Sequence, residues 1–332
     1  MAKPLLLGVE IGGTKLQVGL GHGDGSITQL RRASIRADAG ASAILEQVVE
    51  EADRACWSLD LRREDIEAVG VGFGGPVDAE RGRTTTSHHV PGWDGFPLAD
   101  WCRTTFAVES AAVENDADTA GLGEARFGAG KGKDPLLYVT IGSGVGGGLI
   151  LGGRIHRGVG LGAAEVGHLW VTPPGDSGEG GRTVEQSSSG WSIGLEARRA
   201  LSDRRPDSET LADLVDGDPD QVTAEVVAMA AGLGDAASKA ILDQAARALA
   251  AGLAHAVTLI GPSRIILGGG VSLIGEGLWF GPIRRRLDRL AFPPFRGSFD
   301  LVPAALGESV VVHGALALAR DAWTASRQPG RG

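Results

Sequence analysis

Hydrophobic positions along the chain predict strands and helices of ordinary length, separated by glycine-rich turns. An apolar run at 5–11 ends at Gly12-Gly13, and apolar residues then alternate with polar or small ones at 16–20, which is typical of a strand. Apolar positions recur at helical spacing over 41–57, and a short apolar strand follows at 66–73. The pattern also predicts helices at 98–106 and 314–324, a mostly helical stretch at 209–260, a helix ending near 284–290, strands at 111–114 and 264–267, and a polar loop at 173–190.

The arrangement of strand, glycine turn and strand occurs twice. Segment 5–20 has it, and segment 136–151 has it again, with Ile141-Gly142 in the place of Ile11-Gly12. This weak internal repeat indicates two domains of related architecture. A chance match between apolar strands and glycines is the alternative.

The chain is acidic and poor in cysteine, which limits its classes of function. Its 332 residues suffice for two domains of about 100–200 residues each. Lys plus Arg number 32 and Asp plus Glu 41, so the net charge of −9 disfavours non-specific binding to nucleic acid or anionic membranes. Cys56 and Cys102 are too few for a disulfide framework or a cysteine zinc site. Neither a signal peptide nor an apolar run of about 18 residues stands out, so we expect a cytoplasmic protein without a membrane span.

Glycine is abundant, and its motifs point to phosphate. Gly142, Gly144 and Gly147 fit G-x-G-x-x-G, but a strand pattern follows at 148–151 where a dinucleotide fingerprint requires a helix. Backbone N–H groups in tight glycine turns form anion-binding concavities, and glycine lets a phosphate approach closely. Any one of these motifs alone would be read as a simple turn; three together favour a nucleotide-phosphate site. The candidates for it are Gly12, Gly13, Thr14, Lys15, Gly142, Ser143, Gly144, Gly268, Gly269 and Gly270.

An ordered set of motifs resembles the ROK family (repressors, open reading frames and sugar kinases) of the actin-like ATPase superfamily. The set includes VEIGGTKLQVGL, VENDADTAGLGEARFG at 113–128 and the long glycine-rich segment at 137–171, and it covers nearly the whole chain. The resemblance implies an α/β fold: the two-domain actin-like ATPase (ribonuclease H-like) fold, each domain a mixed β-sheet with flanking helices, with a cleft between. It implies a small domain of residues 1–115 plus 312–332, completed by the C-terminal helix, and a large domain of residues 116–311.

The polar residues of these motifs suit phosphoryl transfer to an alcohol. Asp116 alone would be read as a helix cap, because a helical pattern follows it. By resemblance it is the general base, which takes the proton of the attacking hydroxyl. Glu165 and His168 are one helical turn apart, as a capping or surface pair would also be. The resemblance implies a substrate site formed by Gly75, Asn115, Asp116, Glu165, His168 and Glu185, with Gly268–Gly270 beside the adenosine.

Two features depart from the usual family pattern. Glu10 stands where many relatives have Asp, and by resemblance it would lie near the phosphates and hold Mg²⁺ directly or through water. The stretch 172–184 has no cysteine, although many relatives have a cysteine-rich zinc loop there, and Thr183 takes the place of the last cysteine. We therefore expect no zinc site, and a loop whose role is open.

The resemblance implies an ATP- and Mg²⁺-dependent kinase, glucokinase-like, that phosphorylates the primary 6-hydroxyl of a hexose, with glucose first. N-acetylhexosamines, mannose, amino sugars, fructose and cyclitols stay open as acceptors, as do another nucleotide or polyphosphate as donor. A DNA-binding repressor is disfavoured because the first glycine turn comes within the first dozen or so residues. A non-catalytic sugar sensor is the remaining alternative. The partners implied are a sugar and a nucleotide, and the assembly implied is a homodimer.

Overall fold

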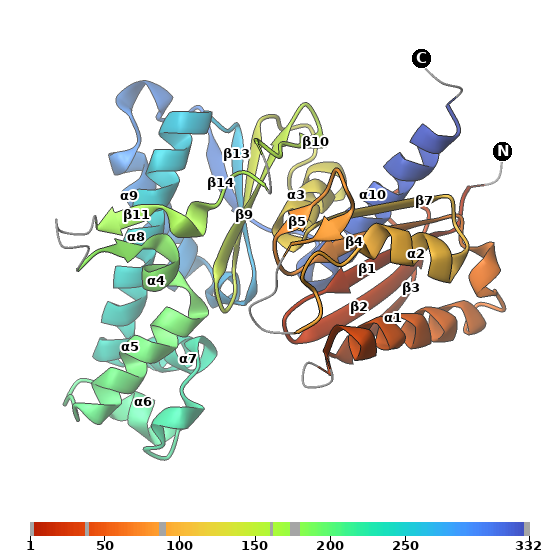
Figure 1. The fold of residues 1–332 in the computed structure, drawn as a ribbon. Helices are drawn as coiled ribbons and strands as arrows, with labels where there is room; N and C mark the ends of the chain where they lie inside the picture. Colours follow the sequence, from red (N-terminus) through yellow and green to blue (C-terminus); the bar gives the residue numbers. More distant parts are fainter. Residues whose placement is uncertain (1–2, 37–39, 86–90, 160–161, 173–179, 329–332) are drawn as a thin grey trace. The chain divides into compact units, whose positions relative to one another are not determined.

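The computed structural model describes residues 3–36, 40–85, 91–159, 162–172 and 180–328 (Figure 1). Its contacts divide the chain into two compact units. The first consists of Met1–Lys133, Gly148–Ala163 and Ala305–Gly332, and the second of Asp134–Gly147 and Ala164–Ala304. The domain boundaries expected from the sequence stay a prediction. None of the helices in the described ranges is long and apolar enough to cross a membrane.

The first unit contains a five-stranded mixed sheet with the order β3-β2-β1-β4-β7. Its strands are β1 (Leu6–Ile11), β2 (Lys15–Gly21), β3 (Ile27–Ser34), β4 (Ala68–Phe73) and β7 (Ser110–Asn115). β1, β2 and β3 pair antiparallel, whereas β4 and β7 run parallel to β1. The expected strands at 5–11, 16–20 and 66–73 are therefore confirmed. A small hairpin of β5 (Val77–Asp78) and β6 (Arg83–Thr84) follows β4.

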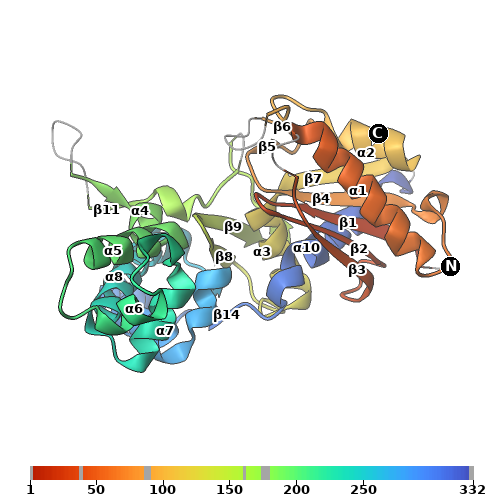
Figure 2. The ribbon, with the colours of Figure 1, turned by 90° about the horizontal axis from the view of Figure 1, so that it is seen from below.

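Helices cover both faces of this sheet (Figure 2). They are α1 (Gly40–Trp57), α2 (Leu98–Phe106), α3 (Asp116–Phe127) and α10 (Val310–Ser326). Because side chains alternate along a strand, Leu7 and Val9 pack in one core with α1 and α2, whereas Leu6 packs with Leu316 of α10 in another. The last helix of the chain thus covers one face of the first sheet.

The backbones of α3 and α10 touch. A Cβ atom on Gly314 would stand 1.8 Å from the carbonyl oxygen of Thr119, and one on Gly123 would stand 3.0 Å from the Gly314 nitrogen. Only glycine fits at such a crossing. This contact fixes the position of α3, which begins at Asp116.

The second sheet has the order β10-β9-β8-β13-β14, which repeats the order of the first. Its strands are β8 (Leu136–Ile141), β9 (Val145–Leu151), β10 (Arg154–Ile155), β13 (Arg264–Gly268) and β14 (Asp300–Pro303). In each sheet the first strand ends at the isoleucine that precedes the glycine turn, Ile11 in β1 and Ile141 in β8. A common strand order supports the internal repeat over a chance match.

Of this sheet, β8, β13, β14 and the start of β9 belong to the second unit, whereas the rest of β9 and β10 belong to the first. Helices and a two-stranded ladder complete the second unit. The helices are α4 (Val184–Ser188), α5 (Gly190–Ser202), α6 (Glu209–Leu214), α7 (Ala224–Leu233), α8 (Ala236–Ile260) and α9 (Gly281–Leu290). The ladder pairs β11 (Trp170–Thr172) with β12 (Arg182–Thr183). The central helix α8 contributes Leu249 and Leu253 to a core that also holds Val139 and Leu267 of the sheet.

The polar loop expected at 173–190 is wrong for its last part. Residues 173–179 lie outside the described residues, but 182–190 forms β12, α4 and the start of α5. Thr183 and Gln186 form a capping box that starts α4, and the hydroxyl of the fully buried Ser188 donates to the Ala245 carbonyl oxygen at 2.9 Å. A serine-rich composition resembles that of a loop, yet here the hydroxyls hold a helix.

Candidate functional site

Three parallel strands of the first unit end at one edge, where the predicted residues of this unit lie. The register pairs Ile11 with Phe73 and Phe73 with Asn115, so the glycine turn, Gly74-Gly75 and Asn115-Asp116 all follow strand ends at the same level. Ligands of α/β proteins commonly bind at this carboxyl edge.

Close packing joins these segments. The Gly74 N–H donates to the Ile11 carbonyl oxygen at 2.7 Å. A Cβ atom on Gly74 would stand 3.2 Å from the Gly12 Cα atom and 3.4 Å from the Asp116 carboxylate. The glycine turn itself closes by a 2.9 Å hydrogen bond from Gly12 N–H to the Lys15 carbonyl oxygen. The predicted base is therefore next to the predicted phosphate turn of its own unit.

Asn115 caps α3 and leaves Asp116 at its first turn. The Asn115 side-chain oxygen accepts from Ala117 N–H at 2.9 Å, and its amide nitrogen donates to the Gly75 carbonyl oxygen at 3.1 Å. The interpretation of Asp116 as the N-cap is thus wrong, because Asn115 fills that position. One Asp116 oxygen also accepts from Ala117 N–H at 2.8 Å. The helix start orients both side chains.

Glu10 is a buried carboxylate on β1, 8% exposed, beside this edge. Gln17 donates a short hydrogen bond to it, and the Lys15 ammonium lies 3.6 Å from its second oxygen. Burial raises the pKa of Glu10; Lys15 and Gln17 partly oppose the rise, and the charge of Asp116 adds to it. A cation bound near the two carboxylates would oppose this rise in the pKa of Glu10.

The second unit has a matching edge. β8 and β13 run parallel with Thr140 beside Gly268, so the Gly142 turn and Gly268–Gly270 follow neighbouring strand ends. Gly142 N–H donates to the Gly144 carbonyl oxygen at 2.9 Å, and Gly190 N–H, at the start of α5, donates to the Gly142 carbonyl oxygen at 2.8 Å. A helix N-terminus thus rests on the turn, which favours negative charge there.

A cavity of about 640 Å³ opens beside this turn. Apolar and glycine walls with a few polar side chains suit a flat, mainly apolar group such as a nucleobase. Arg198 on α5 shapes one side, because it donates to the Val222 carbonyl oxygen at 3.0 Å. The lining residues are Gly142, Ser143, Gly190, Trp191, Gly194, Arg198, Val222, Thr223, Ala224, Glu225, Ala228, Gly270, Val271, Leu273 and Ile274.

The remaining substrate candidates flank the β11–β12 ladder. Val184 N–H donates to the Leu169 carbonyl oxygen at 2.9 Å. His168 and Glu185 are the sequence neighbours of this bonded pair, so their backbones lie close together. Glu165 directly precedes the short 3₁₀ turn that contains His168, whose N–H donates to the Glu165 carbonyl oxygen at 3.0 Å. The two residues are one turn apart, as their spacing predicts, and both are exposed.

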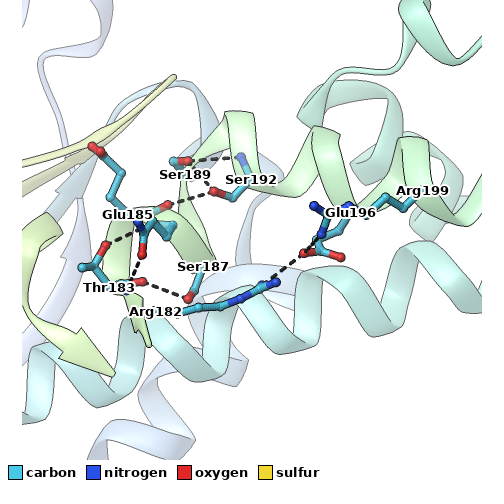
Figure 3. Close-up of polar contacts among 9 residues, drawn as sticks. Arg182, Thr183, Glu185, Ser187, Ser189, Ser192, Glu196 and Arg199 are labelled. Carbon is cyan, nitrogen blue, oxygen red and sulfur yellow. Dashed lines mark hydrogen bonds and ion pairs between the residues drawn. The ribbon is translucent and has the colours of Figure 1, made fainter. Parts of the chain in front are cut away.

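Glu185 connects the ladder to the glycine turn. Its Oε2 accepts from Val145 N–H at 2.8 Å, and a Cβ atom on Gly144 would stand 2.5 Å from that oxygen. Figure 3 shows this carboxylate pointing away from Arg182 and Glu196, while the Ser192 hydroxyl donates to the Glu185 backbone oxygen at 3.0 Å. The absence of a side chain at Gly144 makes room for Glu185.

No group of three or more His, Cys, Asp or Glu side chains in the described part of the chain could hold a metal ion. The two cysteines are buried in the core of the first unit, away from the 172–184 stretch in sequence. Zinc absence stays a prediction. A carboxylate pair such as Glu10 and Asp116 is still compatible with Mg²⁺, which keeps several waters and takes few protein ligands.

The structure thus assembles the predicted residues within each unit. In the first unit, Gly12–Lys15, Glu10, Gly75, Asn115 and Asp116 surround one strand edge; in the second, Gly142–Gly144, Glu185 and Gly268–Gly270 surround the other. Sequence reasoning missed the cavity walls at Trp191, Arg198 and Thr223. These residues reach the Gly142 turn only through the fold, and no local sequence pattern predicts that contact.

This architecture is shared with proteins of known structure. The two α/β units with mixed sheets and flanking helices match the actin-like ATPase fold of ROK glucokinase structures. A family model described as "ROK family" matches residues 6–322. The chain belongs to the ROK family.

Three relatives are informative. The crystal structure of a ROK family glucokinase from Streptomyces griseus in complex with glucose and AMPPNP has 34% identity and a TM-score of 0.81, covering 96% of this chain and 99% of that chain. The glucokinase of Thermotoga maritima is 31% identical over 97% of this chain and 99% of its own length. The kanosamine kinase of Amycolatopsis mediterranei is 31% identical over 81% of this chain and 82% of its own length.

Proposed function

We propose that this chain is a sugar kinase that transfers the γ-phosphoryl group of ATP to the primary 6-hydroxyl of a hexose, with glucose as the first acceptor. One observation carries the proposal: a carboxylate, Asp116, lies next to a glycine turn at the shared edge of β1, β4 and β7. The likeness to glucokinases over nearly the whole chain supports the choice of glucose.

Asp116 acts as the general base. Its carboxylate accepts the proton of the 6-hydroxyl as the oxygen attacks phosphorus and the bond to the ADP oxygen breaks. A positioned base contributes about 10²–10⁴-fold to such a step. Asn115 orients the acceptor with the amide hydrogen that Gly75 does not use, because its side-chain oxygen is held by the helix start.

The glycine turns hold the phosphates, and the 640 Å³ cavity holds the nucleoside. The N–H groups of Gly12 and Gly142 close the two turns. The remaining backbone N–H groups of each turn, with the hydroxyls of Thr14 and Ser143, donate to phosphate oxygens. Lys15 adds a positive charge. Glu165, His168 and Glu185 bind the sugar hydroxyls with carboxylate and imidazole groups, which suit a polyol.

Mg²⁺ fits the donor set of the first unit. Glu10 and Asp116 offer carboxylate oxygens, and their mutual repulsion favours a cation nearby. When bound, the ion neutralises charge on the transferred phosphoryl group. Zinc does not fit the 172–184 stretch, which has no cysteine, and metal analysis of the purified protein tests this expectation.

A coupled assay of ADP release tests the proposal. Mg-ATP is supplied with each member of a panel of hexoses, N-acetylhexosamines, amino sugars and cyclitols. The nearly isosteric Asp116→Asn variant is assayed in parallel. We expect turnover with glucose and a loss of at least 100-fold in the variant, with an unchanged unfolding midpoint. Near-normal turnover in the variant contradicts the base assignment, and silence on every acceptor contradicts the kinase.

An amino hexose is the second candidate acceptor, favoured by the likeness to kanosamine kinase. The two acceptors differ in one amino group, so the ratio of their kcat/KM values decides between them. Polyphosphate in place of ATP tests the donor in the same assay. The cytoplasmic location and the homodimer stay predictions of the resemblance, and sedimentation of the purified protein tests the latter.

A further inference from the structure

A second cavity, of about 500 Å³, lies in the first unit, and the proposed kinase site does not use it. Its walls come from α3, from the last turns of α10, and from the Gly152-Gly153 turn between β9 and β10. The lining residues are Leu122, Arg126, Gly152, Gly153, Arg154, Ile155, Arg157, Leu318, Asp321, Thr324, Ala325 and Gln328. Three arginines stand against one carboxylate among these described residues, in a chain whose net charge is −9.

The three arginines are bound to different degrees. Arg126 donates to both carboxylate oxygens of Asp321, at 2.8 and 2.6 Å, which neutralises it across α3 and α10. Arg157 donates through Nε to the buried Glu114 at 2.8 Å, while 46% of its side chain stays exposed. Arg154 is exposed, and within the described ranges its side chain has no hydrogen bond or ion pair. At least one guanidinium is thus available to a ligand.

This charge pattern favours a phosphate ester. Guanidinium groups bind phosphate through paired N–H donors, and the cavity has the size of sites that hold small metabolites. Thr324 and Gln328 supply neutral polar contacts for a polyol, with Leu122 and Leu318 behind them. The carboxyl end of α10 opposes an anion with about half a charge, which is less than the charge of Arg154 alone.

Arg157 connects the cavity to the proposed catalytic segment. Its partner Glu114 is the last residue of β7 before Asn115-Asp116. A phosphate that engages Arg157 competes with Glu114 for the same donors. Because a buried carboxylate that loses its partner is costly, β7 must adjust when the ligand binds.

We propose that this cavity binds the phosphate group of a small phosphorylated metabolite or free phosphate, and that occupation alters turnover through Arg157 and Glu114. Binding is independent of the proposed kinase activity; the effect on turnover rests on it. Coupling of this kind is reciprocal, so substrates of the kinase site also change the affinity of the cavity.

Calorimetric titration of the whole protein tests binding. Inorganic phosphate and glucose 6-phosphate are the two probes, and Arg154→Glu is compared with Arg289→Glu, an exposed arginine on α9 of the second unit. We expect a saturable step that Arg154→Glu weakens at least 10-fold and Arg289→Glu by less than 2-fold. If only inorganic phosphate shows this step, the ligand is free phosphate; if glucose 6-phosphate is tighter, it is an ester.

Two binding results overturn the proposal: no saturable step with either probe, or equal affinity in wild type and Arg154→Glu. ADP release with and without the probe tests the second half. Glucose 6-phosphate is also the product of the proposed reaction and binds the kinase site in every variant, so the comparison is between variants. We expect the change in kcat or KM caused by the probe to be at least 2-fold larger in wild type and Arg289→Glu than in Arg154→Glu. Binding without any effect on turnover removes the coupling, whereas an inactive chain that still binds removes the kinase assignment alone.

Discussion

Replacing Gly314 by alanine tests whether the contact between α3 and α10 positions the proposed base. The new Cβ atom would stand 1.8 Å from the Thr119 carbonyl oxygen, where ordinary contact requires more than 3.4 Å. The obstacle is backbone, so no side-chain rotation relieves it, and the helices must separate by about 1.5 Å. Overpacking of this kind costs about 1–3 kcal/mol, and replacing a helical glycine gains about 1 kcal/mol, so the net loss of stability is up to about 2 kcal/mol.

In Gly314→Ala, the loss of turnover at a temperature where the protein is folded should be a more prominent effect than the loss of thermal stability. Thr119 lies one turn after Asp116, so the displacement reaches the base. A misplacement of about 1 Å can cost about 100-fold in rate. A unit of this size loses about 2–4 °C per kcal/mol, so we expect the unfolding midpoint to fall by at most about 4–8 °C. We expect kcat to fall at least 10-fold at a temperature where the variant is fully folded.

Gly232→Ala is the matched control. Gly232 lies in α7 with nothing within 4 Å of its absent Cβ atom, so this variant should keep its activity and gain up to about 1 kcal/mol. Calorimetry and the ADP-release assay measure both variants. A Gly314→Ala protein as stable and active as wild type refutes the reasoning.

Three further predictions concern the two strand edges. Burial raises the pKa of Glu10 above 4.5, so protonated Glu10 stabilises the fold below pH 4.5, and this stabilisation is lost as pH rises through the folded pKa. The free energy of unfolding in urea should therefore decline less between pH 4.5 and 7 in Glu10→Gln than in wild type. An equal decline in the two proteins contradicts this. In Gly144→Ala the new Cβ atom displaces the Glu185 carboxylate from Val145 N–H. Losing a charged hydrogen bond of about 1.5–3 kcal/mol should lower kcat/KM for glucose about 10–100-fold. Unchanged steady-state kinetics would contradict a role of Glu185 in binding the sugar. Trp191 lines the proposed nucleoside cavity; Trp191→Phe should remove most of the change in tryptophan fluorescence on adding ATP, and a full signal would place the nucleotide elsewhere.

The strand ends could be predicted from the sequence because apolar runs and glycine turns are local signals. Ile11 and Ile141 each end a buried strand just before a glycine, so both edges were visible without the fold. Helix α4 was not predictable in this way, since buried serines such as Ser188 have the composition of a loop. The role of Asn115 as the cap depended on one residue of register, which propensity does not resolve.

The residues that line the proposed nucleoside cavity could not be predicted from local sequence patterns, for a different reason. Trp191 and Thr223 lie far apart in sequence, and only tertiary packing brings them to the Gly142 turn. The salt bridge between Arg157 and Glu114 is likewise a contact between segments 43 residues apart. Neither residue stands out by composition, and only the fold shows that they meet.

Because α10 stands at the end of the chain, the first sheet receives its last covering helix late in synthesis. The ribosome completes β7 at Asn115 but makes α10 only from Val310, so one face of the first sheet, with Leu6 and Ala68, lacks its cover while the whole second unit is translated. The unit begun first therefore finishes folding last, in contrast to the usual order from the N-terminus. A nascent chain stalled between these points would expose that face to chaperones, and a premature stop there would damage the half of the protein that had already been made.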